Sequence, residues 1–428
     1  MKSPAAFIIL LAALILVIHP AAGQNDHVKY VPKYEDPVLK EIGEQADKEQ
    51  AARDSLTADI REKQAERNKA DKALAMSLRF DMSQIPRPNS PDEFKSLFHF
   101  PPVAQYRTGT CWCFSGISFV ESEIYRVTGE KIKLSEMYIV YYEFLDKVRH
   151  FIRERGDFAV YDGSMSNAVF RVMEKYGAVP IDAYSGLITG ERYDHERMSQ
   201  EIRDYLAFIK NGGYWDEDLA VQSVTLILDK YMGRPPEYFE FEGATFTPRE
   251  FFKKILQVKP EDYIDAMSTL RVPFYSIGEF KVWDNWWHDS SYYNLPLDEW
   301  YGLMKKAIGE GYTVALGGDI SEPGYYGFED IAVVPDFDIP GKYINQDSRE
   351  FRTDNESTGD DHGIHVIGFR NIKGRDWFLI KDSARSGRRG KFEGYFFYRD
   401  DYIKLKMLTF MVHKDALGDI LTKFSQLK

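Results

Sequence analysis

The spacing of apolar residues divides this chain into a helical part and a strand-rich part. From residue 111 to about residue 180, apolar side chains recur every three or four positions, as at Phe114, Ile117 and Val120, and this period predicts helices. Farther along the chain the period shifts toward two, which predicts strands. The predicted strands are Tyr312–Leu316, Ile364–Phe369, Trp377–Lys381, Gly394–Tyr398 and Met407–Val412. The pattern therefore indicates an α+β protein in which a helical lobe precedes a strand-rich lobe.

Aromatic and acidic residues crowd the segment between these two parts, from about residue 185 to residue 310. Its aromatic residues include Trp286, Trp287, Tyr292 and Tyr293. Such side chains could line a cleft for a sugar or a peptide, but they more often fill a core, and we predict core packing for them.

Charged residues dominate the segment from about Pro37 to Leu78. Oppositely charged residues lie four positions apart at Glu44/Lys48, Glu49/Arg53 and Asp59/Lys63. This spacing supports an exposed helix. A thin apolar stripe follows the same helix at Leu56, Ile60, Ala70 and Leu74. The stripe predicts packing on the main domain or on another subunit.

The first 23 residues look like a secretory signal peptide. Lys2 precedes an apolar stretch from Phe7 to Ile18, which is too short to span a membrane, and small residues surround a cleavage site near Gly23. An uncleaved anchor is the alternative, and no other segment is apolar enough to span a membrane. We therefore expect a leader at 1–23, a charged helix and linker at 24–85, a main domain at 86–428, and export to the periplasm or out of the cell.

Composition narrows the function. With 428 residues, of which 44% are hydrophobic, the chain can bury a core large enough for an enzyme. Its formal net charge of −12 argues against binding nucleic acid, because neutralising phosphates requires a basic surface.

The two cysteines, Cys111 and Cys113, are separated by one residue. This spacing closes too small a loop for an ordinary structural disulfide, and two thiols cannot form a four-thiolate zinc site. Cys111 follows a Gly-containing turn and opens a helical pattern, where the helix dipole and free backbone N–H groups favour a thiolate. Cys113 faces the other side of the helix, and we predict that it packs in the core. A redox pair is disfavoured because the helix would hold the two sulfurs apart.

A nucleophilic thiol also needs a base. His362 opens one predicted strand, and Asp382 follows the next, so a hairpin would bring the two side chains together. His365 lies three residues along the strand from His362 and points to the opposite face, which predicts a structural histidine and no shared metal. Asp360 and Asp361 are predicted to be solvated loop residues.

These segments carry a family resemblance over roughly residues 95 to 420. The motifs are Gln-x5-Cys-Trp-x-Phe-Ser from Gln105, Leu134-Ser135-Glu136, His-Gly-Ile-His-Val-Ile-Gly-Phe from His362, Ile380-Lys381-Asp382-Ser383, and Gly394-Tyr395. In order and spacing they resemble the papain-like cysteine peptidases. The closing stretch, residues 394–402 and 412–415, looks more like the bleomycin hydrolase and aminopeptidase C branch.

The resemblance implies a papain-like two-lobe fold, with an antiparallel β-barrel-like lobe and a large, mostly helical insertion at about 185–310. It also implies a thiol aminopeptidase that cleaves peptides through an acyl-thioester, without metal or organic cofactor, usually as a hexamer. The implied roles are nucleophile for Cys111, general acid and base for His362, histidine orienter for Asp382, oxyanion donor for Gln105, and substrate-backbone binding for Asp162, Gly163 and Ser164.

Three positions depart from the family pattern. Asp382 replaces the usual Asn, and its charge should raise the pKa of His362. Ala384 replaces a Trp that usually covers the histidine, so we expect water to reach the pair there. Ser164 replaces a Gly, and its Cβ could crowd an extended substrate.

Two questions stay open at the level of sequence. In the family branch the C-terminus lies in the cleft and restricts substrates to those with a free amino terminus. Here residues 415–428 predict a short amphipathic helix, and the position of Lys428 decides between exopeptidase and endopeptidase. The second alternative is a catalytically weakened papain-fold protein that binds peptides or acts as a scaffold.

Overall fold

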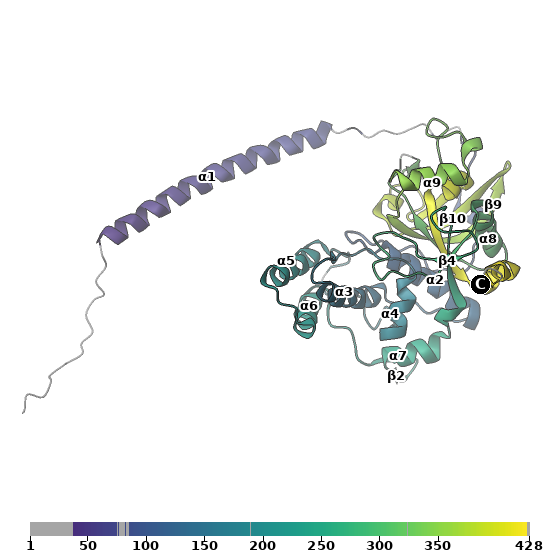
Figure 1. Cartoon of the computed structure of the whole chain (residues 1–428), viewed down its shortest axis with the longest axis horizontal. Coiled ribbons are helices and arrows are strands. Elements are labelled where there is room, and N and C mark those ends of the chain that lie inside the picture. The colour runs from purple at the N-terminus through teal and green to yellow at the C-terminus, as the bar shows by residue number, and fades with distance from the viewer. Residues whose placement is uncertain are drawn as a thin grey trace, which may run out of the picture. The chain divides into compact units, whose positions relative to one another are not determined.

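The computed structural model describes residues 37–74, 76, 82, 85–188, 190–322 and 324–425 (Figure 1). The signal peptide expected at residues 1–23 lies outside them. The chain divides into two compact units, Met1–Ser77 and Leu78–Lys428. Within the described residues, no helix combines the length and the apolar character that a membrane crossing requires.

In the first unit, the charged segment forms one helix of 38 residues, α1 (Pro37–Leu74). Polar side chains four residues apart interact along it, since Gln45 Nε2 donates to Glu49 Oε1 at 3.0 Å and Arg53 lies 3.8 Å from Glu49. Such pairs stabilise an exposed helix by a few tenths of a kcal/mol each, roughly. The surface that its apolar stripe contacts stays a prediction.

Helices form the first half of the second unit. They are α2 (Cys111–Thr128), α3 (Glu136–Arg153), α4 (Ala168–Tyr176), α5 (Glu196–Gly212), α6 (Glu217–Met232) and the short α7 (Pro248–Phe251), which continues as a π-helical turn, Phe252–Leu256. The Ser135 hydroxyl caps α3 by accepting from Tyr138 N, and α2 ends at Gly129, which has a positive φ of 79°. Apolar faces of these helices share one core, and the three helices up to residue 176 lie where the apolar period predicted helices.

A sheet of ten strands forms the other half, in the order β4-β5-β3-β12-β6-β9-β10-β11-β8-β7. The strands are β3 (Tyr263–Met267), β4 (Ile277–Gly278), β5 (Tyr292–Asn294), β6 (Val314–Gly318), β7 (Tyr325–Tyr326), β8 (Ile331–Ala332), β9 (His362–Ile372), β10 (Arg375–Lys381), β11 (Tyr395–Arg399) and β12 (Met407–His413). Neighbouring strands are antiparallel except the pairs β3–β5 and β8–β11, so the sheet is mixed and not purely antiparallel. A separate hairpin joins β1 (Phe239–Phe241) to β2 (Ala244–Phe246).

The five predicted strands correspond to β6, β9, β10, β11 and β12. Where their boundaries differ, the difference is one to three residues. The end of β6 lies beyond the predicted Leu316, because Gly317 and Gly318 pair with β9 and β12. A Cβ on Gly318 would lie 2.5 Å from the carbonyl oxygen of Lys406, so only glycine allows this approach of the strands.

Helices dominate only the first part of the segment at 185–310, in α5 and α6. Its second part adds β3, β4 and β5 to the main sheet, and α8 (Leu297–Gly309) packs on that sheet. The expected helical insertion is therefore partly an extension of the sheet. Trp286 and Tyr292 are buried as predicted, and Trp287 and Tyr293 are half-buried and pack against the core clusters.

The remaining helices connect or follow strands. They are α9 (Gln346–Asp354), α10 (Asp400–Lys406), α11 (Leu421–Ser425) and the 3-10 turns Pro91–Glu93, Pro260–Asp262, Gly341–Tyr343, Arg385–Arg388 and Lys414–Ile420. The predicted C-terminal helix is broken at Gly418, whose φ and ψ are not helical. Phe424 then packs against Tyr275 and Tyr293, on the other face of β5 from Tyr292. Lys428 lies outside the described residues, so its place in the cleft stays a prediction.

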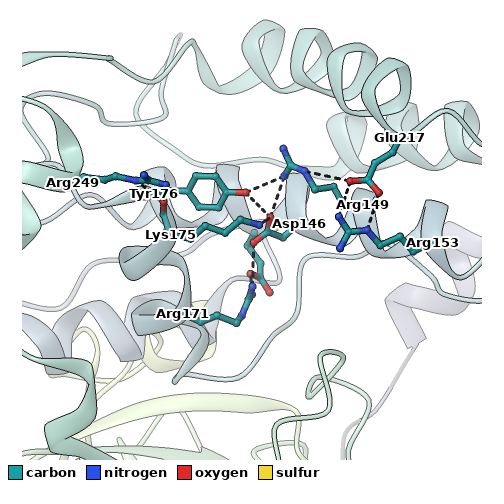
Figure 2. Close-up of polar contacts among 9 residues, drawn as sticks. Asp146, Arg149, Arg153, Arg171, Lys175, Tyr176, Glu217 and Arg249 are labelled. Carbon is teal, nitrogen blue, oxygen red and sulfur yellow. Dashed lines mark hydrogen bonds and ion pairs between the residues drawn. The ribbon is translucent and has the colours of Figure 1, made fainter.

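A buried carboxylate fixes α3 against α4. Figure 2 shows Asp146 among cationic side chains of both helices, where it accepts from Arg149 Nη1 at 3.1 Å, Arg171 Nη1 at 3.2 Å and Lys175 Nζ at 2.6 Å. The Tyr176 hydroxyl donates to the same carboxylate. Several partners are needed because a buried charge is stable only when paired and hydrogen-bonded.

We expect Asp146→Ala to lower the free energy of unfolding by about 3 kcal/mol. This is the lower end for a broken buried ion pair, because Arg149 and Arg171 still reach solvent. Denaturant titration of the full chain measures the loss. Asp204→Ala, which removes an exposed carboxylate on α5, should change the same quantity by less than about 0.5 kcal/mol. Equal stability of the two variants would contradict this role of Asp146.

Candidate active site

Cys111 lies at the first position of α2 and is partly exposed, while Trp112 and Cys113 beside it are buried. Cys113 donates its S–H to the carbonyl oxygen of Glu136 at 3.2 Å, which agrees with the predicted core role. Both thiols are free. The helix start therefore presents one thiol toward the cleft and holds the other in the interior.

His362 and Asp382 meet as the predicted hairpin required. His362 begins β9, Asp382 follows β10, and His362 Nε2 lies 2.7 Å from Asp382 Oδ1. Both side chains are buried. The bond at Nε2 leaves Nδ1 for Cys111, which lies within hydrogen-bonding range of the ring.

Charge sets the protonation of this group of side chains. Burial by itself would lower the pKa of His362, but the charge of Asp382 and the Cys111 thiolate raise that pKa well above its ordinary value. Burial would raise the pKa of Asp382, but His362 holds it below the ordinary value. An imidazolium paired with the Asp382 carboxylate follows. The pKa of His362 is raised, which is the direction that the charge of Asp382 led us to expect.

Because Ala384 replaces the usual Trp, we expected water to reach the His362–Asp382 pair, and this expectation is wrong. Tyr325 covers Asp382 instead: its hydroxyl donates to Asp382 Oδ2 at 2.9 Å, and its ring stacks on Phe396. Ala384 N also donates to Asp382 Oδ1 at 2.8 Å. Asp382 is consequently 1% exposed. Tyr325 lies 57 residues before Asp382 on a two-residue strand, so sequence pattern gave no sign of this contact.

Gln105 joins the turn before Cys111 to the turn after Asp382. Its Oε1 accepts from the Ser383 hydroxyl at 2.7 Å, and its Nε2 donates to the Thr108 carbonyl at 2.8 Å. One side-chain N–H is engaged in this way, and the amide has a second. An oxyanion role for Gln105 would use that second N–H, and it stays a prediction.

Asp162, expected to bind substrate, supports the turn before Cys111. It accepts from Gly109 N at 3.1 Å and from the Ser199 hydroxyl at 2.8 Å, and its own carbonyl accepts from Trp112 Nε1. These contacts tie the loop at 162–164 to the start of α2. The side chain therefore positions the loop and the helix relative to each other.

Ser164 lines the cavity beside Cys111, and its hydroxyl is held from behind. Its hydroxyl donates to Glu143 Oε1 at 2.8 Å, and Trp286 Nε1 donates to the same oxygen at 2.7 Å. The hydroxyl is thus held toward α3, while crowding of an extended substrate by the Ser164 Cβ stays a prediction. At Gly163 a Cβ would come within 2.6 Å of Asp284 Oδ1, which explains the glycine there.

The cavity beside Cys111 contains carboxyl groups that the sequence patterns did not identify. Cys111 and His362 line it together with Asp265, Asp284 and Asp360. Asp360 lies in a loop as predicted but is half-buried at the cavity, whereas Asp361 is exposed and accepts from the neighbouring loop at Ile320 N. The position of Asp360 two residues before the candidate base was the only available signal.

Metal binding finds no support in side-chain placement. Among the described residues, no group of three or more His, Cys, Asp or Glu side chains could hold a metal ion. His365 is buried and its Nδ1 lies 2.8 Å from the Ser118 hydroxyl, which fits the structural role expected for it.

The fold and the site define an α+β protein in which a thiol, an imidazole and a carboxylate meet between a helix start and a sheet. No protein-family model matches the chain, and no curated protein matches it. Among solved structures it is similar to PepW from Lactobacillus rhamnosis HN001, determined as the selenomethionine derivative. The TM-score is 0.62 at 18% sequence identity, covering 78% of this chain and 84% of PepW, so the two chains share a fold.

We expect Asp382→Asn to lower the pKa of His362 by about one unit or more. The amide still offers an oxygen to the ring, but the charge that favours the imidazolium is lost. Nitrogen NMR of the histidine side chains, followed from acidic to alkaline pH, measures the change. Tyr325→Phe keeps the carboxylate charge and should shift the pKa of His362 much less. An unchanged pKa in Asp382→Asn would contradict the assignment of the charge effect.

Proposed function

We propose that this chain is a papain-like cysteine peptidase that hydrolyses peptide bonds through an acyl-thioester on Cys111. The observation that carries the proposal is the Cys111 thiol at the start of α2, within reach of the buried His362–Asp382 pair. The motifs that resemble papain-like enzymes and the fold shared with PepW support the same conclusion.

The chemistry follows from these groups. The Cys111 thiolate attacks the peptide carbonyl carbon, and the His362 imidazolium gives its proton to the leaving amine as the C–N bond breaks. A thioester remains on Cys111. His362, now neutral, takes a proton from water, the resulting hydroxide attacks the thioester, and the carboxylic product leaves as the thiolate is restored.

Asp382 and Gln105 complete the proposed machinery. Asp382 holds the ring by its Nε2 and stabilises the imidazolium that carries the transferred proton. Gln105 and the Cys111 backbone N–H are proposed to stabilise the oxyanion, a contribution that typically amounts to about 10²- to 10³-fold in rate.

A weakened enzyme that only binds peptides is less well supported. Sequence arguments for it rested on Ala384, Ser164 and the extra N-terminal helix. Tyr325 shields Asp382 where the usual Trp is missing, and Glu143 draws the Ser164 hydroxyl toward α3. The loss of shielding expected at Ala384 is therefore no longer a reason for lost activity, and the Cβ of Ser164 remains one.

We further propose that the enzyme is an aminopeptidase, exported, and assembled as a homo-oligomer. These finer statements rest on the sequence resemblance and on the leader-like first 23 residues.

The test compares a dipeptide amide that has a free amino group with its N-acetylated form, using protein that begins at Gln24. We expect turnover of the free-amino form, and a loss on the order of a thousand-fold or more in Cys111→Ala and in His362→Ala. Cys113→Ala is the matched control, because this thiol lies in the core, and it should keep the activity.

Cleavage of both forms would support the proposal of a cysteine peptidase but contradict the proposed aminopeptidase specificity. Cleavage of neither, with Cys111 no more reactive to iodoacetamide than a free thiol, would contradict the proposal and favour the peptide-binding alternative.

A further inference from the structure

Small residues leave room in the sheet beside Cys111. Ala315 and Gly317 of β6 and Gly363 of β9 line the cavity. A Cβ on Gly363 would lie 3.2 Å from Trp112 Cα, and one on Gly317 would lie 3.0 Å from Thr409 Oγ1. The space that remains is about 20 Å³, enough for a group the size of a water molecule.

Three carboxyl groups from separate parts of the fold border this space. Asp265 lies on β3, Asp284 in the loop before β5, and Asp360 two residues before the start of β9. Asp360 Oδ1 lies 3.2 Å from where a Cβ on Gly317 would be, which places its carboxyl directly over the glycine. The same cavity contains the thiol and the imidazole, so a group bound there adjoins the reacting bond.

The cations near these carboxyl groups are largely engaged elsewhere. The charge of Lys147 lowers the pKa of Asp284, but the Lys147 ammonium donates its hydrogen bonds to the carbonyl oxygens of Tyr161 and Gly163. The charge of His362 lowers the pKa of Asp360, but the His362 ring is hydrogen-bonded to Asp382. The other groups facing the cavity carboxyls are Asp289, Asp361, Asp319, Glu143, Asn167 and the Tyr161 hydroxyl. The cavity is therefore short of positive charge.

An unpartnered hydroxyl in the same cavity points to a ligand. Tyr292 is fully buried and lines the cavity. Among the described residues its hydroxyl makes no hydrogen bond of acceptable geometry, although the Asn167 side chain lies near enough to lower its pKa. The side-chain oxygen of Asn167, next to Asp265, also lacks a hydrogen bond among the described residues, although its Nδ2 donates to Asp265 and Asp289. A buried polar group without a partner costs about 1–3 kcal/mol, which a hydrogen-bond donor would recover.

An ammonium group matches these features. It is compact, carries a positive charge, and has three donors and no acceptor. Two carboxyl groups and the Tyr292 oxygen would accept all three. A metal ion is a poorer match, because these side chains do not converge as a set of metal ligands among the described residues.

We infer that this cavity, lined by Asp265, Asp284, Asp360 and Tyr292, is the subsite that binds an ammonium group of the peptide substrate. The group comes from a free amino terminus or from a lysine side chain. The inference rests on the proposed peptidase function and names the substrate chemistry of that site.

Protonation makes the binding dependent on pH. Burial and the neighbouring Asp289 raise the pKa of Asp265 to about 8, and burial raises the pKa of Asp284 to about 6, partly offset by Lys147. Burial and nearby carboxylates also raise the pKa of Asp360. The empty subsite thus retains protons near neutral pH, and a bound cation favours their release. Affinity for an ammonium group should therefore increase from pH 6 to pH 8.

The first experiment measures kcat/KM for matched norleucine and lysine dipeptide amides. N-acetyl-lysine against N-acetyl-norleucine tests the side-chain source, and free-amino against N-acetylated norleucine tests the terminal source. At least one ratio should exceed about tenfold, as expected when a charged group gains hydrogen bonds. Asp265→Asn and Asp360→Asn should each reduce that ratio severalfold, whereas Asp298→Asn, an exposed carboxylate on α8, should leave it unchanged.

The second experiment is independent of turnover. Calorimetry of Cys111→Ala protein with n-butylamine should show binding that is stronger at pH 8 than at pH 6 and is lost in Cys111→Ala/Asp265→Asn. Its thermal unfolding midpoint confirms that the double variant is folded.

The outcomes separate the two claims. Amine binding without cleavage of any peptide would contradict the peptidase function and retain the subsite. Cleavage with both ratios near one and no amine binding would overturn the subsite and retain the peptidase. Ratios that stay high in Asp265→Asn and Asp360→Asn would also overturn it.

Discussion

The buried ion pair of His362 and Asp382 is the interaction on which the candidate site depends. Two buried charges are costly unless each is paired and hydrogen-bonded, and here the antiparallel contact of β9 and β10 brings them together. Tyr325 and the Ala384 N–H satisfy the remaining capacity of the carboxylate. The imidazolium this creates can stabilise a thiolate at Cys111, so the sheet determines the chemistry of the helix start.

Polar contacts hold the helical part in register with that pair. Gln105 links the turn before Cys111 to the turn after Asp382, and Asp162 links the same turn to the cleft loop. Behind the loop, Glu143 accepts from Ser164 and Trp286 and pairs with Arg171. The cleft is therefore bordered by side chains whose own positions are fixed from several elements, which is a requirement for catalysis by positioned groups.

Local periodicity predicted much of this fold. Helices α2, α3 and α4 and strands β6 and β9–β12 each bury a continuous face, so apolar residues recur along them with the period of a helix or a strand. Strands β3, β4, β5, β7 and β8 are two to five residues long and are defined by distant partners, and no local pattern reports such pairing. The same reason explains which site residues could be predicted from the sequence and which could not. Cys111, His362 and Asp382 stand in recognisable motifs, whereas Asp265 and Tyr325 reach the cleft only through tertiary structure.

Trapping the acyl-enzyme tests the central claim most directly. A peptide ester mixed with the enzyme and quenched in acid within the first turnovers should leave a covalent adduct with the mass of the acyl portion. Peptide mapping should place it on Cys111, and His362→Ala should form it far more slowly. Turnover without an adduct, or an adduct on another residue, would contradict the account.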